Sequence, residues 1–238
     1  MRLRLRFTKY GKVRFTSHRD VARIWERAFR RAGLPLAYTG GFSPRPRVSF
    51  GLALPTGYES DGEYLDVDLA GPVPLDGLCA RLSALLPDGM DATAVAEIDP
   101  REPSLQEAVQ WCSWTIDLPD VAPPEAATRV AQLLAATELR VARTRKGVEA
   151  VDDIRGGIGR LEVAGPLHEP PGTILAADLV AHPRALRPSE LVEAGWPGQA
   201  PLRARRTHQW IERDGARAEP LELRGGATAA PHVERRAS

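Results

Sequence analysis

The sequence contains few of the features that mark exported, membrane-anchored or disulfide-linked proteins. Only two cysteines, Cys79 and Cys112, occur among 238 residues, far apart and in no paired motif. This content argues against a disulfide framework and favours a reducing compartment. No apolar targeting segment stands at the arginine-rich start, and no apolar run approaches the roughly 20 residues of a membrane span. We expect a cytoplasmic protein without membrane contact.

Motifs for metals and cofactors are also missing. The five histidines are scattered without ligand spacing, and the two cysteines do not complete a zinc site with them. The run Gly156-Gly157-Ile158-Gly159 lacks the spacing of a nucleotide-binding loop, so we interpret it as a turn. We therefore expect no metal and no cofactor.

Acidic residues are nearly absent from the first 51 positions. Thirteen Lys and Arg stand there against Asp20 and Glu26 alone, an excess of eleven positive charges. Residues 52–128 reverse the sign, with fifteen acidic residues against Arg81 and Arg101. The net charge of the whole chain is only +1, so its balance conceals a strong segregation. A localised basic surface most often binds a polyanion, usually nucleic acid.

The first hundred residues predict the order β-α-β-β-α-β. Residues 2–7 alternate Arg with apolar residues, the pattern of a half-buried strand. Ser17 is the expected N-cap of a helix, with Asp20 in the capping-box position. The remaining expected elements are an extended segment at 13–15, an extended region from 36 to 50, strands at 63–69 and 90–98, and a helix at 75–86.

A similar pattern follows a junction at residues 99–103. It predicts strands or extended stretches at 113–118, 139–142, 147–154, 160–163, 173–180 and 203–212, with helices at 124–137 and 188–194. The fold class expected is α+β, as tandem ferredoxin-like (β-α-β-β-α-β) plaits. The expected domains cover residues 1–105 and 106–224, followed by a disordered tail at 225–238.

The first strand supplies one group of candidate RNA-binding cations. In a plait, Arg2, Arg4 and Arg6 would lie on the open face of the sheet, which RNA-binding plaits use. The alternative is internal neutralisation. The first strand neighbours the third in this topology, so Arg4 and Arg6 can instead pair with Asp66 and Asp68.

The first helix supplies a second group. Its cations lie off the apolar stripe and face solvent or a partner: Arg23, Arg27, Arg30 and Arg31. Solvated faces usually mix signs, so four arginines with one glutamate favour an anionic partner. The alternative is a solvated face with a Glu26–Arg30 contact worth tenths of a kcal/mol.

The segment 39–47, TGGFSPRPR, is the sharpest local feature. We expect phosphate and stacking contacts from Phe42, Arg45 and Arg47. Lys12, in the turn after the first strand, is a further candidate RNA-binding cation. Gly41, Pro44 and Pro46 would shape the loop. The alternative is a rigid structural turn that packs Phe42 into the core.

One histidine is a candidate catalytic residue. His18 follows the expected N-cap and could act as a general acid or base with Tyr10 and Lys12. Metal-independent endoribonucleases of similar outline use such chemistry, although this analogy rests on fold. A lone histidine near a helix cap is more often a packing or hydrogen-bonding residue.

Residues 14–69 resemble a known family. The segment RFTSHRDVARIWERAFRRAGLPLAYTGGFSPRPRVSFGLALPTGYESDGEYLDVDL is similar to the core of the radical-SAM-linked domain family, and the resemblance covers about the first hundred residues. The matching positions are Phe15, Ser17, His18, Asp20, Arg23, Gly41, Phe42, Pro44, Pro46, Ser49, Phe50, Pro55, Gly57, Glu63, Tyr64, Leu65 and Asp66.

The resemblance implies a partner rather than an activity. The family has no settled function and is fused to, or encoded beside, cobalamin-binding radical SAM enzymes. This chain has no CxxxCxxC triplet for a cluster, so radical chemistry would belong to the partner. Our leading hypothesis is a non-catalytic RNA-binding accessory protein that presents tRNA or rRNA to such an enzyme. The alternatives are an endoribonuclease using His18, and a protein-interaction module that docks on the radical SAM partner.

Overall fold

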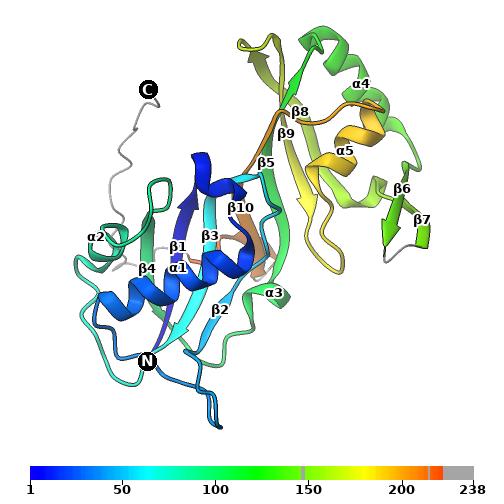
Figure 1. Ribbon diagram of the computed structural model, residues 1–238. Helices are drawn as coiled ribbons and strands as arrows, with labels where there is room; N and C mark the ends of the chain where they lie inside the picture. Colours follow the sequence, from blue (N-terminus) through cyan, green and yellow to red (C-terminus); the bar gives the residue numbers. More distant parts are fainter. Residues whose placement is uncertain (146–147, 214, 222–238) are drawn as a thin grey trace. The chain divides into compact units, whose positions relative to one another are not determined.

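The computed structural model describes residues 1–145, 148–213 and 215–221, in two compact units (Figure 1). The first unit comprises Met1–Ala108 and the chain from Glu219 onward, and the second comprises Val109–Ala218. The sequence predicted a division after residue 105. In the structure the chain divides after residue 108 and returns to the first unit at residue 219. The tail expected at 225–238 lies outside the described residues.

The first unit contains a four-stranded antiparallel sheet with the strand order β4-β1-β3-β2. Its element order matches the β-α-β-β-α-β order expected from the sequence, with two short additions, η1 and α3. The elements are β1 (Arg2–Lys9), η1 (Gly11–Phe15), α1 (His18–Arg31), β2 (Val48–Phe50), β3 (Glu59–Asp68), α2 (Leu78–Ser83), β4 (Ala92–Ile98) and α3 (Leu105–Ala108).

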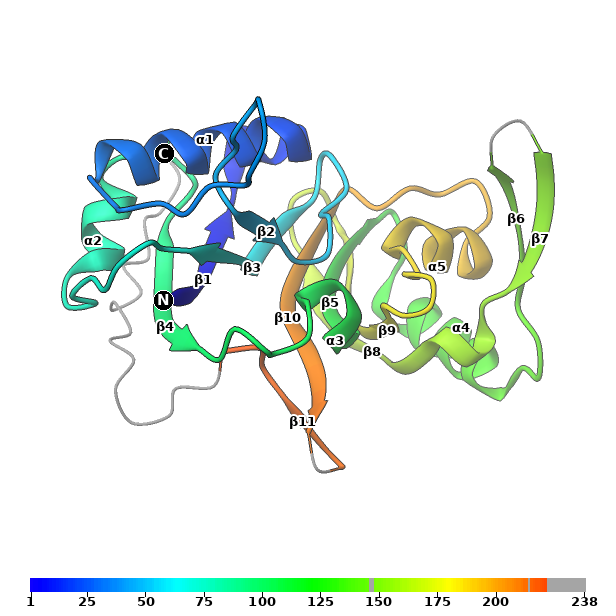
Figure 2. The ribbon, with the colours of Figure 1, turned by 90° about the horizontal axis from the view of Figure 1, so that it is seen from below.

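Alternation along β1 builds the core of this unit. Leu3, Leu5 and Phe7 are buried in one apolar cluster with residues of α1 and α2. The Phe7 ring meets the Trp25 ring edge to face, with centroids 5.0 Å apart. Helices α1 and α2 therefore cover one face of the sheet (Figure 2). The arginines that alternate with these apolar residues point to the opposite face.

Helix α1 forms for local reasons that the sequence indicates. The Ser17 hydroxyl accepts a hydrogen bond from the Asp20 backbone N–H at 3.2 Å, which satisfies one free donor of the first turn. Val21, Trp25, Ala28 and Phe29 recur at helical spacing and are buried. The polar residues between them are therefore left on the outer side.

The second unit contains a four-stranded antiparallel sheet with the order β10-β5-β9-β8. Strand β11 pairs with β10, and β6 and β7 form a separate hairpin. The elements are β5 (Val109–Pro119), α4 (Pro123–Ala135), β6 (Arg140–Arg145), β7 (Val148–Asp153), η2 (Arg155–Gly157), β8 (Ile158–Leu167), β9 (Gly172–Val180), α5 (Pro188–Gly195), β10 (Arg203–Arg213) and β11 (Ala216–Ala218).

The α+β class expected from the sequence is confirmed. Two local expectations are wrong. Residues 13–15 were expected to be extended but belong to the 3-10 turn η1. The helix expected at 75–86 spans only Leu78–Ser83, because Gly77 adopts a left-handed φ of 68° immediately before it. Within the described part of the chain, no helix has the length and apolar character to cross a bilayer.

Candidate functional site

Two arginines of β1, Arg2 and Arg4, form ion pairs with carboxylates on β3. The register places Arg2 opposite Asp68 and Arg4 opposite Asp66. Arg2 Nε donates to Asp68 Oδ1 at 2.6 Å, and Arg4 Nε donates to Asp66 Oδ1 at 2.8 Å. Cross-strand pairing, the alternative raised from the sequence, is therefore observed for Arg4 and Asp66. The expected partner of Asp68 was Arg6, but the antiparallel register places Arg2 there. The Arg2 guanidinium lowers the pKa of the Asp68 carboxyl, which keeps this pair charged.

The face of the first sheet that was expected to be open is covered around Arg4. Arg4 Nη1 donates to Glu102 Oε2 and to the Pro220 carbonyl, both at 3.2 Å, and the residue is 2% exposed. Arg6 Nη2 lies 3.8 Å from Glu219 Oε1. Segments after β4 and after β11 thus reach across this face.

Tyr64 of β3, an aromatic residue that could stack on a base if it were exposed, is also buried. It packs with Ala94, Leu105 and Leu221, and burial raises the pKa of its phenol well above the usual value. The expectation that Arg2, Arg4 and Arg6 lie on an open RNA-binding face is wrong, because carboxylates and returning chain occupy that face. We leave these arginines out of the surface considered below.

The arginines of α1 have a different environment. Five of them are exposed, since the apolar stripe faces the sheet: Arg19, Arg23, Arg27, Arg30 and Arg31. Arg23 Nη1 lies 3.1 Å from Asp20 Oδ1, and Arg30 Nη1 lies 3.9 Å from Glu26 Oε2. The Ser17 hydroxyl, followed by Arg23, lowers the pKa of Asp20, which keeps that carboxyl ionised. Among the described residues, the other three arginines form no ion pair.

The TGGFSPRPR loop is a hairpin whose two sides are joined by hydrogen bonds. The Thr39 N–H donates to the Arg45 carbonyl, and the Arg47 N–H donates to the Ala37 carbonyl, each at 2.9 Å. The Arg45 N–H also donates to Thr39 Oγ1 at 3.1 Å. Gly41 at the tip adopts a φ of 103°, which favours glycine.

Phe42 projects from this loop into solvent. Its relative exposure is 110%, so the alternative that packs Phe42 into the core is wrong. Arg45 is exposed on the stem of the same loop, and Arg47 Nε lies 3.1 Å from Asp68 Oδ2 while its side chain is 55% exposed. Pro44 and Pro46 fix the backbone between these residues.

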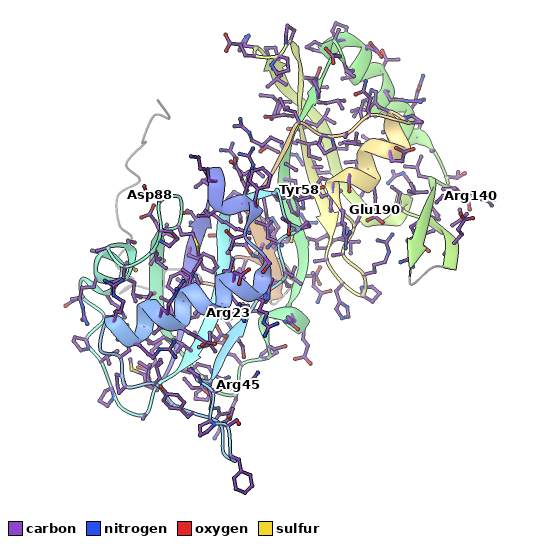
Figure 3. All side chains as sticks on the ribbon, viewed as in Figure 1. Arg23, Arg45, Tyr58, Asp88, Arg140 and Glu190 are labelled. Atoms are coloured by element: carbon purple, nitrogen blue, oxygen red, sulfur yellow. The ribbon has the colours of Figure 1, made fainter. Side chains whose placement is uncertain are left out.

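Helix α1 and the loop lie on the same face of the first unit. Figure 2 shows both above the strands of the first sheet, and Figure 3 labels Arg23 on α1 and Arg45 on the loop. We call this set of residues the α1–loop surface: Arg19, Arg23, Arg27, Arg30, Arg31, Phe42, Arg45 and Arg47. Lys12 is exposed on η1, outside it.

A small hollow opens beside the start of α1. His18 lines it with Lys9, Phe50 and Glu63, and the His18 ring meets the Phe50 ring edge-on at 5.3 Å. Tyr10 is not part of its lining, and the Tyr10 hydroxyl donates to an Asp61 carboxylate oxygen. Lys12 does not line it either. The structure therefore does not group His18, Tyr10 and Lys12 around this hollow.

The second sheet carries a cluster of polar and aromatic side chains that the sequence analysis did not predict. The Ser113 hydroxyl donates to Asp178 Oδ1 at 2.6 Å and accepts from Trp210 Nε1 at 2.7 Å. Arg217 donates to Asp178 Oδ2 at 2.9 Å, and its guanidinium lies 5.0 Å from the Trp111 ring centroid. Alternation in β5 places Trp111 and Ser113 on one face, the only sequence signal for the cluster.

In the described residues, no group of three or more His, Cys, Asp or Glu side chains is placed to hold a metal ion.

The comparison with protein-family models identifies the family of this chain. The model for "Uncharacterized protein conserved in bacteria (DUF2344)" matches residues 2–188. The chain belongs to this family. A comparison with curated proteins finds no match.

The DUF2344 match includes the whole α1–loop surface, whereas Trp210 and Arg217 follow its last residue. Among solved structures, the chain is similar to one chain of the "Crystal Structure of a Cbf5-Nop10-Gar1 Complex", at 10% identity and a TM-score of 0.47. The alignment covers 87% of this chain and 48% of that chain, so this chain spans about half its length. A TM-score below 0.5 does not establish a common fold.

Proposed function

We propose that this protein is a non-catalytic RNA-binding protein that contacts RNA through the α1–loop surface. The observation that carries the proposal is the set of exposed arginines on α1, of which Arg19, Arg27 and Arg31 form no ion pair with described residues. Like charges on one helix face repel each other at low salt. A polyanion removes this repulsion and releases counterions, which favours binding.

Two further features favour RNA over other polyanions. Guanidinium groups bind phosphates through two parallel hydrogen bonds and stack on bases, which lysine does not do. The loop adds an exposed aromatic ring, Phe42, and an exposed cation on its stem, Arg45, and exposed aromatic rings stack on unpaired bases. The RNA classes that we propose are tRNA and rRNA, as expected in the sequence analysis.

Filter binding with a structured RNA tests this proposal. The affinity should fall steeply as salt rises, and heparin should compete less well than unlabelled RNA at equal charge. No affinity at low salt would reject the proposal. Competition by heparin equal to that by RNA would also reject it, since the surface would then respond to charge alone.

We also propose that the protein presents this RNA to a radical SAM enzyme in the cytoplasm. This part rests on the family resemblance of residues 14–69. Purification of this protein from nuclease-treated extract tests the proposal. The radical SAM enzyme should co-purify with it in the absence of RNA, and a ternary complex should form when RNA is added back. An enzyme that co-purifies while RNA affinity is absent would instead make the protein an interaction module.

Finally, we propose that each unit is a ferredoxin-like plait. Three observations support this: the strand orders β4-β1-β3-β2 and β10-β5-β9-β8, the antiparallel pairing throughout, and the two helices in each β-α-β-β-α-β series. The β6–β7 hairpin would be an insertion after the first helix of the second plait. An experimental structure of each unit would test this assignment.

A further inference from the structure

We propose that the loop tip selects RNA in which an unpaired nucleotide interrupts a duplex, with Phe42 stacking on that base while α1 follows the adjoining phosphates. This inference rests on the proposed RNA-binding function and names its substrate class. It follows from the different character of the two parts of the α1–loop surface.

Helix α1 supplies a row of positive charges but no pocket. Its 14 residues form a rod about 21 Å long, with arginines at 19, 23, 27, 30 and 31. Four residues advance about 6 Å along the axis, so the cations form a continuous row instead of a pocket for one phosphate. A row of this kind suits a phosphate backbone and does not distinguish one sequence from another.

The loop presents one fully exposed aromatic ring, Phe42, on a hydrogen-bonded stem. Both strands of its stem are hydrogen-bonded, through Thr39 to Arg45 and through Arg47 to Ala37. Arg47 is held in addition by Asp68. The Phe42 ring thus lies at the tip of a hydrogen-bonded stem, and it is fully exposed to solvent. Because the stem is ordered beforehand, little loop entropy is lost when a ligand binds.

A duplex offers no partner for such a ring. Paired bases stack on each other, and the deep, narrow major groove of A-form RNA excludes side chains. An unpaired base exposes a π face on which an aromatic ring can stack, whatever its identity. Arg45, exposed on the stem of the same loop, can contact a phosphate of the bound strand. The combination of a cation row and one exposed ring therefore fits a stem with a protruding nucleotide.

The test compares three RNAs of equal charge: a perfect duplex, the same duplex with one unpaired purine, and an unstructured strand. The bulged duplex should bind about 5- to 150-fold more tightly than the perfect duplex, the range expected for one stacked base. Phe42→Ala should abolish this preference and leave duplex affinity unchanged, whereas Phe42→Trp should retain it.

Phe15→Ala is the matched control, since Phe15 is also an exposed phenylalanine, 61% accessible, with Arg14 over its ring at 4.7 Å. It should leave all three affinities unchanged. In addition, 5-iodouridine at the unpaired position should crosslink to the peptide containing Phe42 on irradiation.

The outcomes separate this inference from the proposed function. No affinity for any of the three RNAs rejects both. Binding with equal affinity for bulged and perfect duplexes, or a preference that survives Phe42→Ala, rejects the inference and leaves the RNA-binding function in place. Capture of a protein that depends on Phe42, with unchanged RNA affinities, also overturns it and assigns the loop to a protein partner.

Discussion

Arg4 and Asp66 face each other across β1 and β3, and the Arg4 guanidinium donates to both carboxylate oxygens, at 2.8 and 2.9 Å. Both residues are buried. The basic amino-terminal segment thus contains two kinds of arginine. Those of β1 lie near carboxylates of the first unit, whereas those of α1 are exposed.

The first prediction concerns this pair. Arg4→Met should lower the free energy of unfolding by about 3–5 kcal/mol, because it leaves the Asp66 carboxylate buried without its guanidinium. The double variant Arg4→Met/Asp66→Leu should recover much of the loss, since two apolar side chains replace two charges. Urea denaturation followed by circular dichroism measures both values. Equal stability of wild type and Arg4→Met would contradict the assignment.

The second prediction concerns pH. Hydrogen bonding to Arg2 lowers the pKa of Asp68 in the folded protein. A carboxyl with a lowered folded-state pKa stabilises the fold above its unfolded pKa of about 3.9, and this stabilisation is lost as the pH falls through the folded value. Asp68→Asn should therefore be less stable than wild type at pH 7, with the difference shrinking below about pH 4. Exposed Asp76→Asn should match wild type throughout, and a difference that grows in acid would refute the argument.

A third prediction tests the turn before β4. Gly89 has a φ of 90°, and a Cβ there would lie 2.4 Å from the Tyr10 carbonyl oxygen. Gly89→Ala should destabilise the protein by about 1–3 kcal/mol, because neither the backbone angle nor the contact can be relieved cheaply. Gly71→Ala, which meets open space, should change the melting temperature little. Thermal melts of the two variants that coincide would contradict this.

Local patterns predicted much of the fold. The alternation of residues 2–7 and the apolar stripe from Val21 to Phe29 depend only on neighbours in the chain, and the structure contains β1 and α1 there. Strand and helix ends were less accurate. The helix expected from residue 75 begins at Leu78, because the φ of Gly77 depends on its turn and not on a sequence period.

The candidate site was only partly predictable for a related reason. Sequence reasoning raised the pairing of β1 with Asp66 and Asp68 as an alternative, but could not decide it. The further partners of Arg4 and Arg6, Glu102 and Glu219, come from distant segments that no local pattern connects. The exposure of Phe42 depends likewise on hydrogen bonds across the loop stem.

The fourth prediction addresses catalysis. RNA incubated with the purified protein in EDTA should stay intact, because the Tyr10 hydroxyl is engaged with Asp61 and the His18 ring packs against Phe50. Denaturing gel electrophoresis measures this, with His18→Ala as the comparison. Cleavage by wild type that His18→Ala loses would replace the non-catalytic proposal with an endoribonuclease.

The salt dependence of RNA affinity tests the central claim most directly. The variant Arg19→Ala/Arg27→Ala/Arg31→Ala should bind more weakly than wild type and reduce the slope of log affinity against log salt by ~2.1–2.7, at ~0.7–0.9 per lost phosphate contact. The matched control Arg101→Ala/Arg140→Ala/Arg160→Ala removes the same charge from exposed arginines elsewhere and should keep most of the slope. Equal slopes for the two triple variants would contradict RNA binding by α1.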